Sequence, residues 1–193
     1  MELQEAIRQR RSVRRFLPRP VPGEAVRAVV DAARFAPSAH NRQGWEFIVI
    51  QDRERLTALS RRRFARFLAE APLAIVVCGK FPSLRAREGE GLHSQARRVF
   101  GVIDVSLAGQ NLMLTAHSLG LGTCWVGDFD EDAVRAIFAI PPTHSPVAII
   151  AVGYPAERRR APERRPLAEV LHWEAFGRSG AAGDPGPDGD GHP

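Results

Sequence analysis

The stretch Arg10-Arg11-Ser12-Val13-Arg14-Arg15-Phe16 holds four arginines and one serine within seven residues. It lies between a short amphipathic run and a proline-rich turn, so we expect its charges to be held in fixed positions. Guanidinium groups beside a hydroxyl suit a phosphate dianion, because the planar fork donates two parallel hydrogen bonds. A solvated surface run or a nucleic-acid patch has the same composition. The rest of the chain has to decide between these interpretations.

The length and composition predict one domain with a real core, since the chain has 193 residues of which 44% are hydrophobic. No apolar run reaches the roughly 18 residues of a membrane span. The first five residues lack the features of a secretory signal. Cys78 and Cys124 are the only cysteines, so neither a disulfide framework nor a zinc site is expected. We therefore expect a cytoplasmic protein without membrane attachment or bound metal.

The charge balance is basic, with a net charge of +5. Lys80 is the only lysine, so nearly all of the positive charge is arginine. This balance permits anionic ligands, including nucleotides. No helix-turn-helix, zinc-finger or RNA-binding signature accompanies the arginines, so no nucleic-acid partner is expected.

The apolar periodicity predicts alternating helices and strands, and therefore an α+β or α/β layered fold. We expect helices over residues 2–10, 22–35, 52–67, 99–119 and 130–138, and strands over residues 45–50, 73–78, 121–127 and 146–152. Residues 80–95 have no clear period and are interpreted as an excursion at the rim of an active site. From residue 177 the chain is rich in Gly, Pro and Asp, which predicts disorder. The expected division is a domain over residues 1–176 and a tail over 177–193.

Five stretches in a fixed order carry a resemblance to a known family. They are Arg10–Phe16, Ala36-Pro37-Ser38-Ala39-His40-Asn41-Arg42-Gln43, Gly120-Leu121-Gly122-Thr123-Cys124-Trp125-Val126-Gly127, Val152-Gly153-Tyr154-Pro155 and Arg164-Arg165-Pro166-Leu167. From its first helix to about Trp173, the chain resembles the FMN-dependent nitroreductase family. The resemblance implies an α+β fold with a mixed sheet flanked by helices, an intertwined homodimer, and one FMN in each of two sites at the dimer interface.

The resemblance also assigns roles to individual residues. It implies that the FMN phosphate is bound by Arg10, Arg11, Ser12 and Arg164, and that Arg14 approaches the pyrimidine edge of the ring, where a cation stabilises negative charge. The loop residues Pro37, Ser38, Ala39, Asn41 and Gln43 are implied to contact the FMN of the other subunit. The backbone of Val126 and Gly127 is implied to lie along the flavin, with Trp125 beside it.

Several residues keep two interpretations. Asp104 either points towards the partner's flavin and tunes it, as Arg14 would, or it caps a helix or pairs with an arginine at the dimer interface. Cys124 is interpreted as a small core residue in preference to a nucleophile, because no base is evident near it in sequence. His40 is a loop residue that either reaches substrate or is solvated. Gly44 stands where many relatives have proline, so a looser turn is expected before Trp45.

The activity implied by the resemblance is that of an NAD(P)H-dependent flavin oxidoreductase with a ping-pong cycle. NADPH or NADH would reduce FMN, which would then pass hydride to nitroaromatic or quinone-like acceptors. No catalytic side chain is required, because the flavin carries the chemistry. The alternatives are an enzyme of the same fold that acts on a deazaflavin intermediate, fragments FMN or removes halogens, and a non-catalytic flavin-binding dimer.

Overall fold

The computed structural model describes residues 1–61, 63–81, 83–84, 91–157 and 160–178. The chain divides into two compact units, Met1–Arg159 and Arg160–Pro193. The second unit contains the short 3-10 helix η3 (Leu167–Glu169) and is described by itself. The expected tail lies mostly outside the described residues, so the division at residue 177 stays a prediction.

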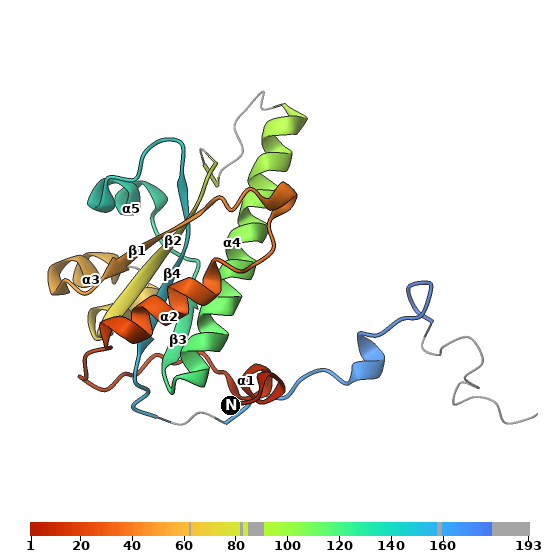
Figure 1. The fold of residues 1–193 in the computed structure, drawn as a ribbon, viewed down its shortest axis with the longest axis horizontal. Helices are drawn as coiled ribbons and strands as arrows, with labels where there is room; N and C mark the ends of the chain where they lie inside the picture. The colour runs from red at the N-terminus through yellow and green to blue at the C-terminus, as the bar shows by residue number, and fades with distance from the viewer. Residues whose placement is uncertain (62, 82, 85–90, 158–159, 179–193) are drawn as a thin grey trace, which may run out of the picture. The chain divides into compact units, whose positions relative to one another are not determined.

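The first unit is built on a four-stranded sheet of β1 (Trp45–Ile50), β2 (Leu73–Gly79), β3 (Gly122–Val126) and β4 (Ser145–Gly153) (Figure 1). The strand order is β1-β2-β4-β3, and each neighbouring pair is antiparallel. The expected mixed sheet is therefore wrong for the described strands. Apolar patterns locate strands but carry no direction, because a helical connection can return the chain to either end of a sheet.

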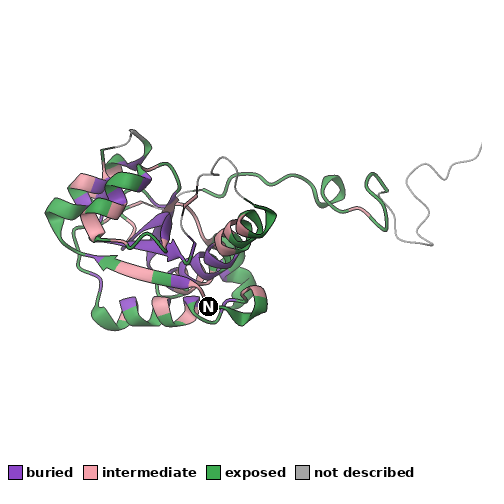
Figure 2. Ribbon diagram, turned by 90° about the horizontal axis from the view of Figure 1, so that it is seen from above, coloured by how far each residue is buried: buried purple, intermediate pink, exposed green. Residues whose placement is uncertain are grey.

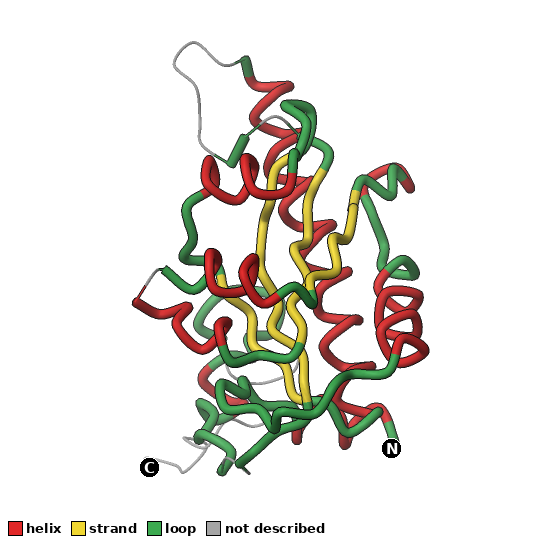
Figure 3. Tube along the Cα trace, turned by 90° about the vertical axis from the view of Figure 1, so that its left-hand side faces the viewer, coloured by secondary structure: helices red, strands yellow, loops and turns green. Residues whose placement is uncertain are grey.

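Helices cover both faces of this sheet (Figure 3). One face packs on α2 (Gly23–Ala33) and α4 (Leu92–Ser118), and the other on α3 (Arg53–Leu59), the 3-10 helix η2 (Arg63–Ala69) and α5 (Glu131–Phe138). Every residue of β2 is buried, since alternate side chains enter one of the two cores (Figure 2). The continuous apolar run of β2 follows from this position between two layers.

The central helix α4 has 27 residues and begins earlier than the expected residue 99. Its N-terminal turns carry mostly polar and charged residues, so the apolar spacing that predicts a helix does not extend to them. Its most apolar window has a mean hydropathy of 1.3, so by length and composition it could cross a membrane. It is nevertheless a core helix of this fold, because Val105, Leu112 and Ala116 are buried against α2 and the sheet.

Capping residues explain the starts of α3 and α5 and the end of α4. Asp52 Oδ1 accepts the Arg55 N–H at 2.8 Å, and Asp130 Oδ1 accepts the N–H groups of Asp132 and Ala133 at 3.1 Å. Gly120, with φ of +77°, follows the end of α4 as expected. The single helix expected over 52–67 is wrong: α3 ends at Leu59 and η2 begins after a break. Of the expected excursion over 80–95, residues 82 and 85–90 lie outside the described residues.

Candidate functional site

The arginine-rich stretch is held in place by its backbone. It follows α1 (Leu3–Gln9) directly. Ser12 forms a parallel bridge to Thr123 of β3, and the Val13 N–H donates to the Thr123 carbonyl at 2.8 Å. Further along, the Leu17 N–H donates to the Tyr154 carbonyl at 2.9 Å. These bonds fix the backbone that carries the arginines, and the positions of the charges themselves stay a prediction.

A glycine permits this close approach. A Cβ atom on Gly122 would lie 2.7 Å from Cγ2 of Val13, which real Cβ atoms do not tolerate. Val13 is itself buried, with 7% of its surface exposed. The glycine before Thr123 is thus needed to seat the arginine stretch against β3.

A first cavity of about 450 Å³ opens beside this junction, lined by Arg10, Arg11, His117 and Thr123 among others. Among the described residues, three buried polar atoms here have no hydrogen-bond partner: Arg11 Nε, His117 Nε2 and Thr123 Oγ1. Burial, with the guanidinium groups of Arg10 and then Arg11, lowers the pKa of His117 from its ordinary value of 6.5. Buried donors beside two cations fit a phosphate group.

Arg11 has a second role that sequence reasoning missed. Its Nη1 atom donates to the carbonyl of Arg8 and, at 2.7 Å, to the carbonyl of Arg10. These carbonyls lie at the C-terminal end of α1, where the last backbone acceptors of a helix lack partners. Part of the Arg11 guanidinium therefore closes α1, while its Nε is buried without a hydrogen-bond partner among the residues that are described.

A second cavity of about 520 Å³ gathers Arg14, Trp125, Val126 and Gly127. The structure thus brings these predicted residues together. The Trp125 ring packs against α4 at Gly109, where a Cβ atom would lie 2.5 Å from the ring. A Cβ atom on Gly127 would meet only an ordinary contact, with Trp125 Nε1 at 3.6 Å, so no close packing within the chain requires this glycine.

Sequence reasoning missed four residues that line the second cavity: Phe64, Arg66, Phe67 and Asp128. Phe64 and Phe67 fall within the helix expected over residues 52–67. Because α3 ends at Leu59, they instead belong to η2, and Phe64 is 69% exposed. Two phenylalanines lining one cavity offer an apolar surface to a ligand, and this grouping becomes visible only in the fold.

The loop with the remaining predicted residues forms around the 3-10 helix η1 (Ala39–Asn41). His40, Asn41 and Gln43 adopt left-handed φ values of 54°, 53° and 49°. Polar bonds hold this backbone: Ser38 Oγ accepts the Gln43 N–H at 3.0 Å, and Gln43 Nε2 donates to Asn41 Oδ1 at 3.1 Å. The left-handed residues are thus supported locally, as functional loops often are.

The buried Asp104 of α4 anchors this loop. Its Oδ1 atom accepts the Ala39 N–H at 3.0 Å. Within the described part of the chain, Asp104 forms no ion pair with an arginine. A capping bond is among the interpretations left open for Asp104, and this one reaches the first amide of η1 in the same chain. A carboxylate reaching the loop through a hydrogen bond fixes the distance between the loop and α4.

The predicted residues fall into two groups that one chain keeps apart. The first group lies around β3 and the end of α4 near His117, and the second lies on the loop at Asp104. His117, beside the first cavity, lies about 20 Å along the helix axis from Asp104, given a rise of about 1.5 Å per residue. Trp125 of the first group packs nearer to Asp104, at Gly109. Arg164 belongs to the second compact unit, so its role at the phosphate stays a prediction.

Both cysteines belong to the core. Cys78 is 1% exposed on β2, and burial raises the pKa of its thiol to about 12. Cys124 is 2% exposed on β3 and packs in the core beside α3 and α5. The interpretation of Cys124 as a small core residue is confirmed.

Comparison with known proteins identifies the fold. A model of the Nitroreductase family matches residues 7–66 and 58–154. The chain belongs to the Nitroreductase family. A protein of Methanothermobacter thermautotrophicus, named as a candidate NADH dehydrogenase/NAD(P)H nitroreductase, is 40% identical over 162 residues, which cover 81% of this chain and 79% of the relative. The expected family resemblance is therefore confirmed, and the protein is an oxidoreductase of the nitroreductase type.

Two further relatives bear on the chemistry. The 5,6-dimethylbenzimidazole synthase of Rhodospirillum rubrum is 30% identical over 188 residues, covering 86% of each chain. The structure of an FMN-dependent nitroreductase from Clostridium difficile R20291 superposes with a TM-score of 0.74 at 30% identity, covering 90% of this chain and 99% of that one. Enzymes of this family thus include both reductases and a synthase.

Proposed function

We propose that the protein is a cytoplasmic FMN-dependent oxidoreductase that takes hydride from NADPH or NADH and reduces nitroaromatic or quinone-like acceptors in a ping-pong cycle. We further propose that it acts as a homodimer with FMN at the subunit interface. The family and the FMN-dependent Clostridium relative support the cofactor. The donor set of the first cavity, with its unpartnered buried polar atoms, independently fits the FMN phosphate.

The observation that carries the proposal is the separation of the two groups of site residues. Around β3 the chain offers cations and a cavity, and at Asp104 it offers a loop held in a left-handed conformation. Within one chain, the cavity at His117 and the loop anchor at Asp104 lie about 20 Å apart along α4. A second copy that places its loop over the first copy's cavities would complete the site.

An exposed apolar surface supports this dimer. Along α4, Val99, Ile103 and Leu107 are 54%, 47% and 41% exposed, and on α1, Leu3 and Ile7 are 64% and 49% exposed. Apolar side chains repeated along one helix face without cover are typical of protein interfaces. A dimer would bury them.

Each residue group would have its own task. Arg10, Arg11 and Ser12 would bind the phosphate, and Arg14 would place a cation beside the ring. The backbone of Val126 and Gly127 would lie along the ring, and Phe64 and Phe67 would exclude water from it. FMN, when bound, supplies the hydride chemistry, so the protein's own work is to bind, orient and exclude water.

The test is the absorbance spectrum of the purified protein under anaerobic conditions, before and after NADPH and then NADH. We expect a flavin spectrum that bleaches with at least one donor. A protein that neither carries nor accepts FMN would contradict the proposal. Bound FMN that neither donor bleaches would support the non-catalytic flavin-binding dimer instead.

The relative from Rhodospirillum rubrum favours a second candidate, an enzyme that fragments FMN. The two candidates differ in the fate of the flavin. Under oxygen with excess NADPH, a reductase returns intact FMN after each turnover, whereas a fragmenting enzyme releases a benzimidazole. Chromatography of the small molecules after prolonged incubation separates them.

A further inference from the structure

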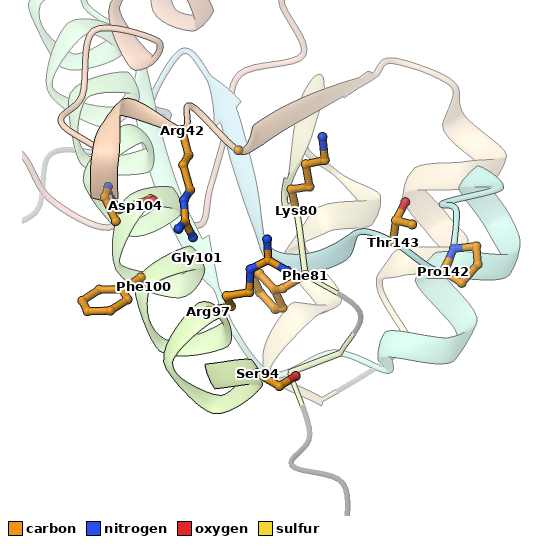
Figure 4. Close-up of a pocket in the computed structure, with 12 residues that line it drawn as sticks. Arg42, Lys80, Phe81, Ser94, Arg97, Phe100, Gly101, Asp104, Pro142 and Thr143 are labelled. Atoms are coloured by element: carbon orange, nitrogen blue, oxygen red, sulfur yellow. Dashed lines mark hydrogen bonds between the residues drawn. The ribbon is translucent and has the colours of Figure 1, made fainter. Parts of the chain in front are cut away.

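A third cavity, of about 560 Å³, lies beside the loop and is separate from the arginine-rich stretch (Figure 4). Four segments form its walls: the loop at residues 39–44, the end of β2 at 80–81, α4 at 94–104 and the turn at 142–143. Two bonds tie these walls together. The Lys80 N–H donates to the Gly44 carbonyl at 2.8 Å, and Asp104 holds the Ala39 N–H at 3.0 Å.

Three cationic side chains line this cavity: Arg42, Lys80 and Arg97. Figure 4 shows Arg42 extending from the loop towards α4 and Arg97 extending from α4 towards the loop. Among the residues that the structure describes, no carboxylate forms an ion pair with any of the three. The one acidic residue in the lining, Asp104, is occupied by the Ala39 amide. The cavity therefore carries an excess of positive charge.

The floor of the cavity is an aromatic ring held from two sides. Phe81 is 2% exposed. A Cβ atom would lie 2.4 Å from this ring if added to Gly79, and 2.5 Å if added to Gly101. Both glycines are therefore needed to let Phe81 pack between β2 and α4. Phe100, 49% exposed, adds a second ring at the rim.

We propose that this cavity is a subsite for a planar ligand that carries an anionic group, such as a carboxylate, sulfonate or phosphate. The exposed Phe100 ring contacts the flat part of the ligand, and the buried Phe81 supports the cavity floor. The guanidinium groups of Arg42 and Arg97 donate to the anion in the paired geometry that such groups favour. As a statement about substrates, the inference rests on the proposed function. The anion belongs either to an aromatic acceptor or to NADPH.

The test uses two matched acceptors, 4-nitrobenzoate and the neutral 4-nitrobenzamide. Their binding to the oxidised protein is measured by calorimetry without an electron donor, and their reduction is measured separately. We expect 4-nitrobenzoate to bind at least tenfold more tightly. In the Arg42→Gln and Arg97→Gln variants, its affinity should fall by about tenfold or more, because a charge-assisted hydrogen bond contributes about 1.5–3 kcal/mol. The amide should be unaffected.

The control is Arg27→Gln, which removes an exposed arginine of α2 that does not line this cavity. It should leave both affinities unchanged. Lys80→Gln provides a variant outside α4 and the loop, should either arginine variant fail to fold. The inference is wrong if 4-nitrobenzoate and 4-nitrobenzamide bind equally well and the KM values for NADPH and NADH are the same in the arginine variants as in the unaltered protein.

The source of the anion follows from a second measurement. If Arg97→Gln raises KM for NADPH and leaves KM for NADH unchanged, the 2′-phosphate of the donor is the anion that the cavity binds. If KM changes only for 4-nitrobenzoate, the anion belongs to the acceptor. Calorimetry with 4-nitrobenzoate needs no flavin reduction, so failure of the proposed function and failure of this subsite give different results.

Discussion

Asp104 Oδ1 accepts the Ala39 N–H at 3.0 Å and so joins the middle of α4 to a loop 65 residues earlier in the chain. Asp104 is 8% exposed. The bond fixes one wall of the third cavity and the backbone of the loop proposed to reach the partner's FMN. It is the contact on which both proposals most depend.

Removing this carboxylate should loosen the loop. We expect Asp104→Ala to lower the free energy of unfolding by about 1–3 kcal/mol, because the partly buried Ala39 N–H loses its acceptor. Thermal unfolding measures the effect. Asp104→Asn keeps an oxygen at this position and should recover most of the stability. Equal losses in both variants would show that the charge of Asp104 matters more than its hydrogen bond.

The first cavity should lose flavin when its cations are removed. We expect Arg10→Ala to weaken FMN binding by about ten- to hundredfold, the equivalent of one charge-assisted hydrogen bond. Fluorescence titration with FMN measures the dissociation constant. Arg15→Ala removes an exposed arginine from the same stretch and is the control. If Arg10→Ala binds FMN as the unaltered protein does, the phosphate lies elsewhere.

The lowered pKa of His117 predicts a loss of stability in acid. The unfolded chain takes up a proton on this ring near pH 6.5, and the folded protein resists it. The unfolded state therefore binds more protons below that pH. Stability that is complete above pH 6.5 is lost as the pH falls towards the folded pKa. Unfolding midpoints between pH 7.5 and pH 5.5 should fall further for the flavin-free protein than for its His117→Gln variant. Parallel curves would contradict this assignment.

A buried ion pair at the start of α5 should contribute more than a surface pair. Arg135 Nη2 donates to Glu131 Oε1 at 3.1 Å, and Ser145 Oγ donates to the same oxygen at 3.1 Å. Arg135→Met leaves the Glu131 carboxylate buried without its cation, which should cost about 3–5 kcal/mol. Chemical denaturation measures the loss, and adding Glu131→Leu should restore part of it.

The Asp31–Arg34 pair is the matched control for the buried pair. Its atoms are closer, at 2.6 Å, yet both side chains are 58% exposed. Solvent screening should hold the cost of Asp31→Ala below about 1 kcal/mol. If the two pairs contribute equally, burial does not decide the stability of ion pairs in this protein.

Local sequence patterns predicted helices and strands well where the pattern follows directly from the burial or capping of the residues concerned. The run Leu73–Cys78 is apolar at every position because both faces of β2 are covered, and Asp52 and Asp130 cap helices through bonds to residues two or three further on. The break after Leu59 was missed because the apolar spacing continues across it. The start of α4 at Leu92 was missed because its first turns are mostly polar and add nothing to the apolar stripe. The antiparallel sheet was missed because strand direction is a property of the whole chain.

The candidate site was predictable only in part. The arginine stretch was predicted from its residues and the segment Trp125–Gly127 from the family resemblance, and the two converge on β3 in the structure. The bond from Asp104 to Ala39 and the lining of the third cavity join residues far apart in sequence, and no local pattern reports them. Phe64 was read as a helix residue and lies instead at a cavity.

The placement of the two groups of site residues at different points along α4 has a genetic consequence. In the proposed dimer, each site combines the arginine stretch of one subunit with the loop of the other. A variant altered at Arg10 and a variant altered at Asp104 would each form dimers with two defective sites. A mixed dimer of the two would place both lesions in one site and leave the other intact. Co-expression of two inactive alleles should therefore restore activity, with one working site for every mixed pair.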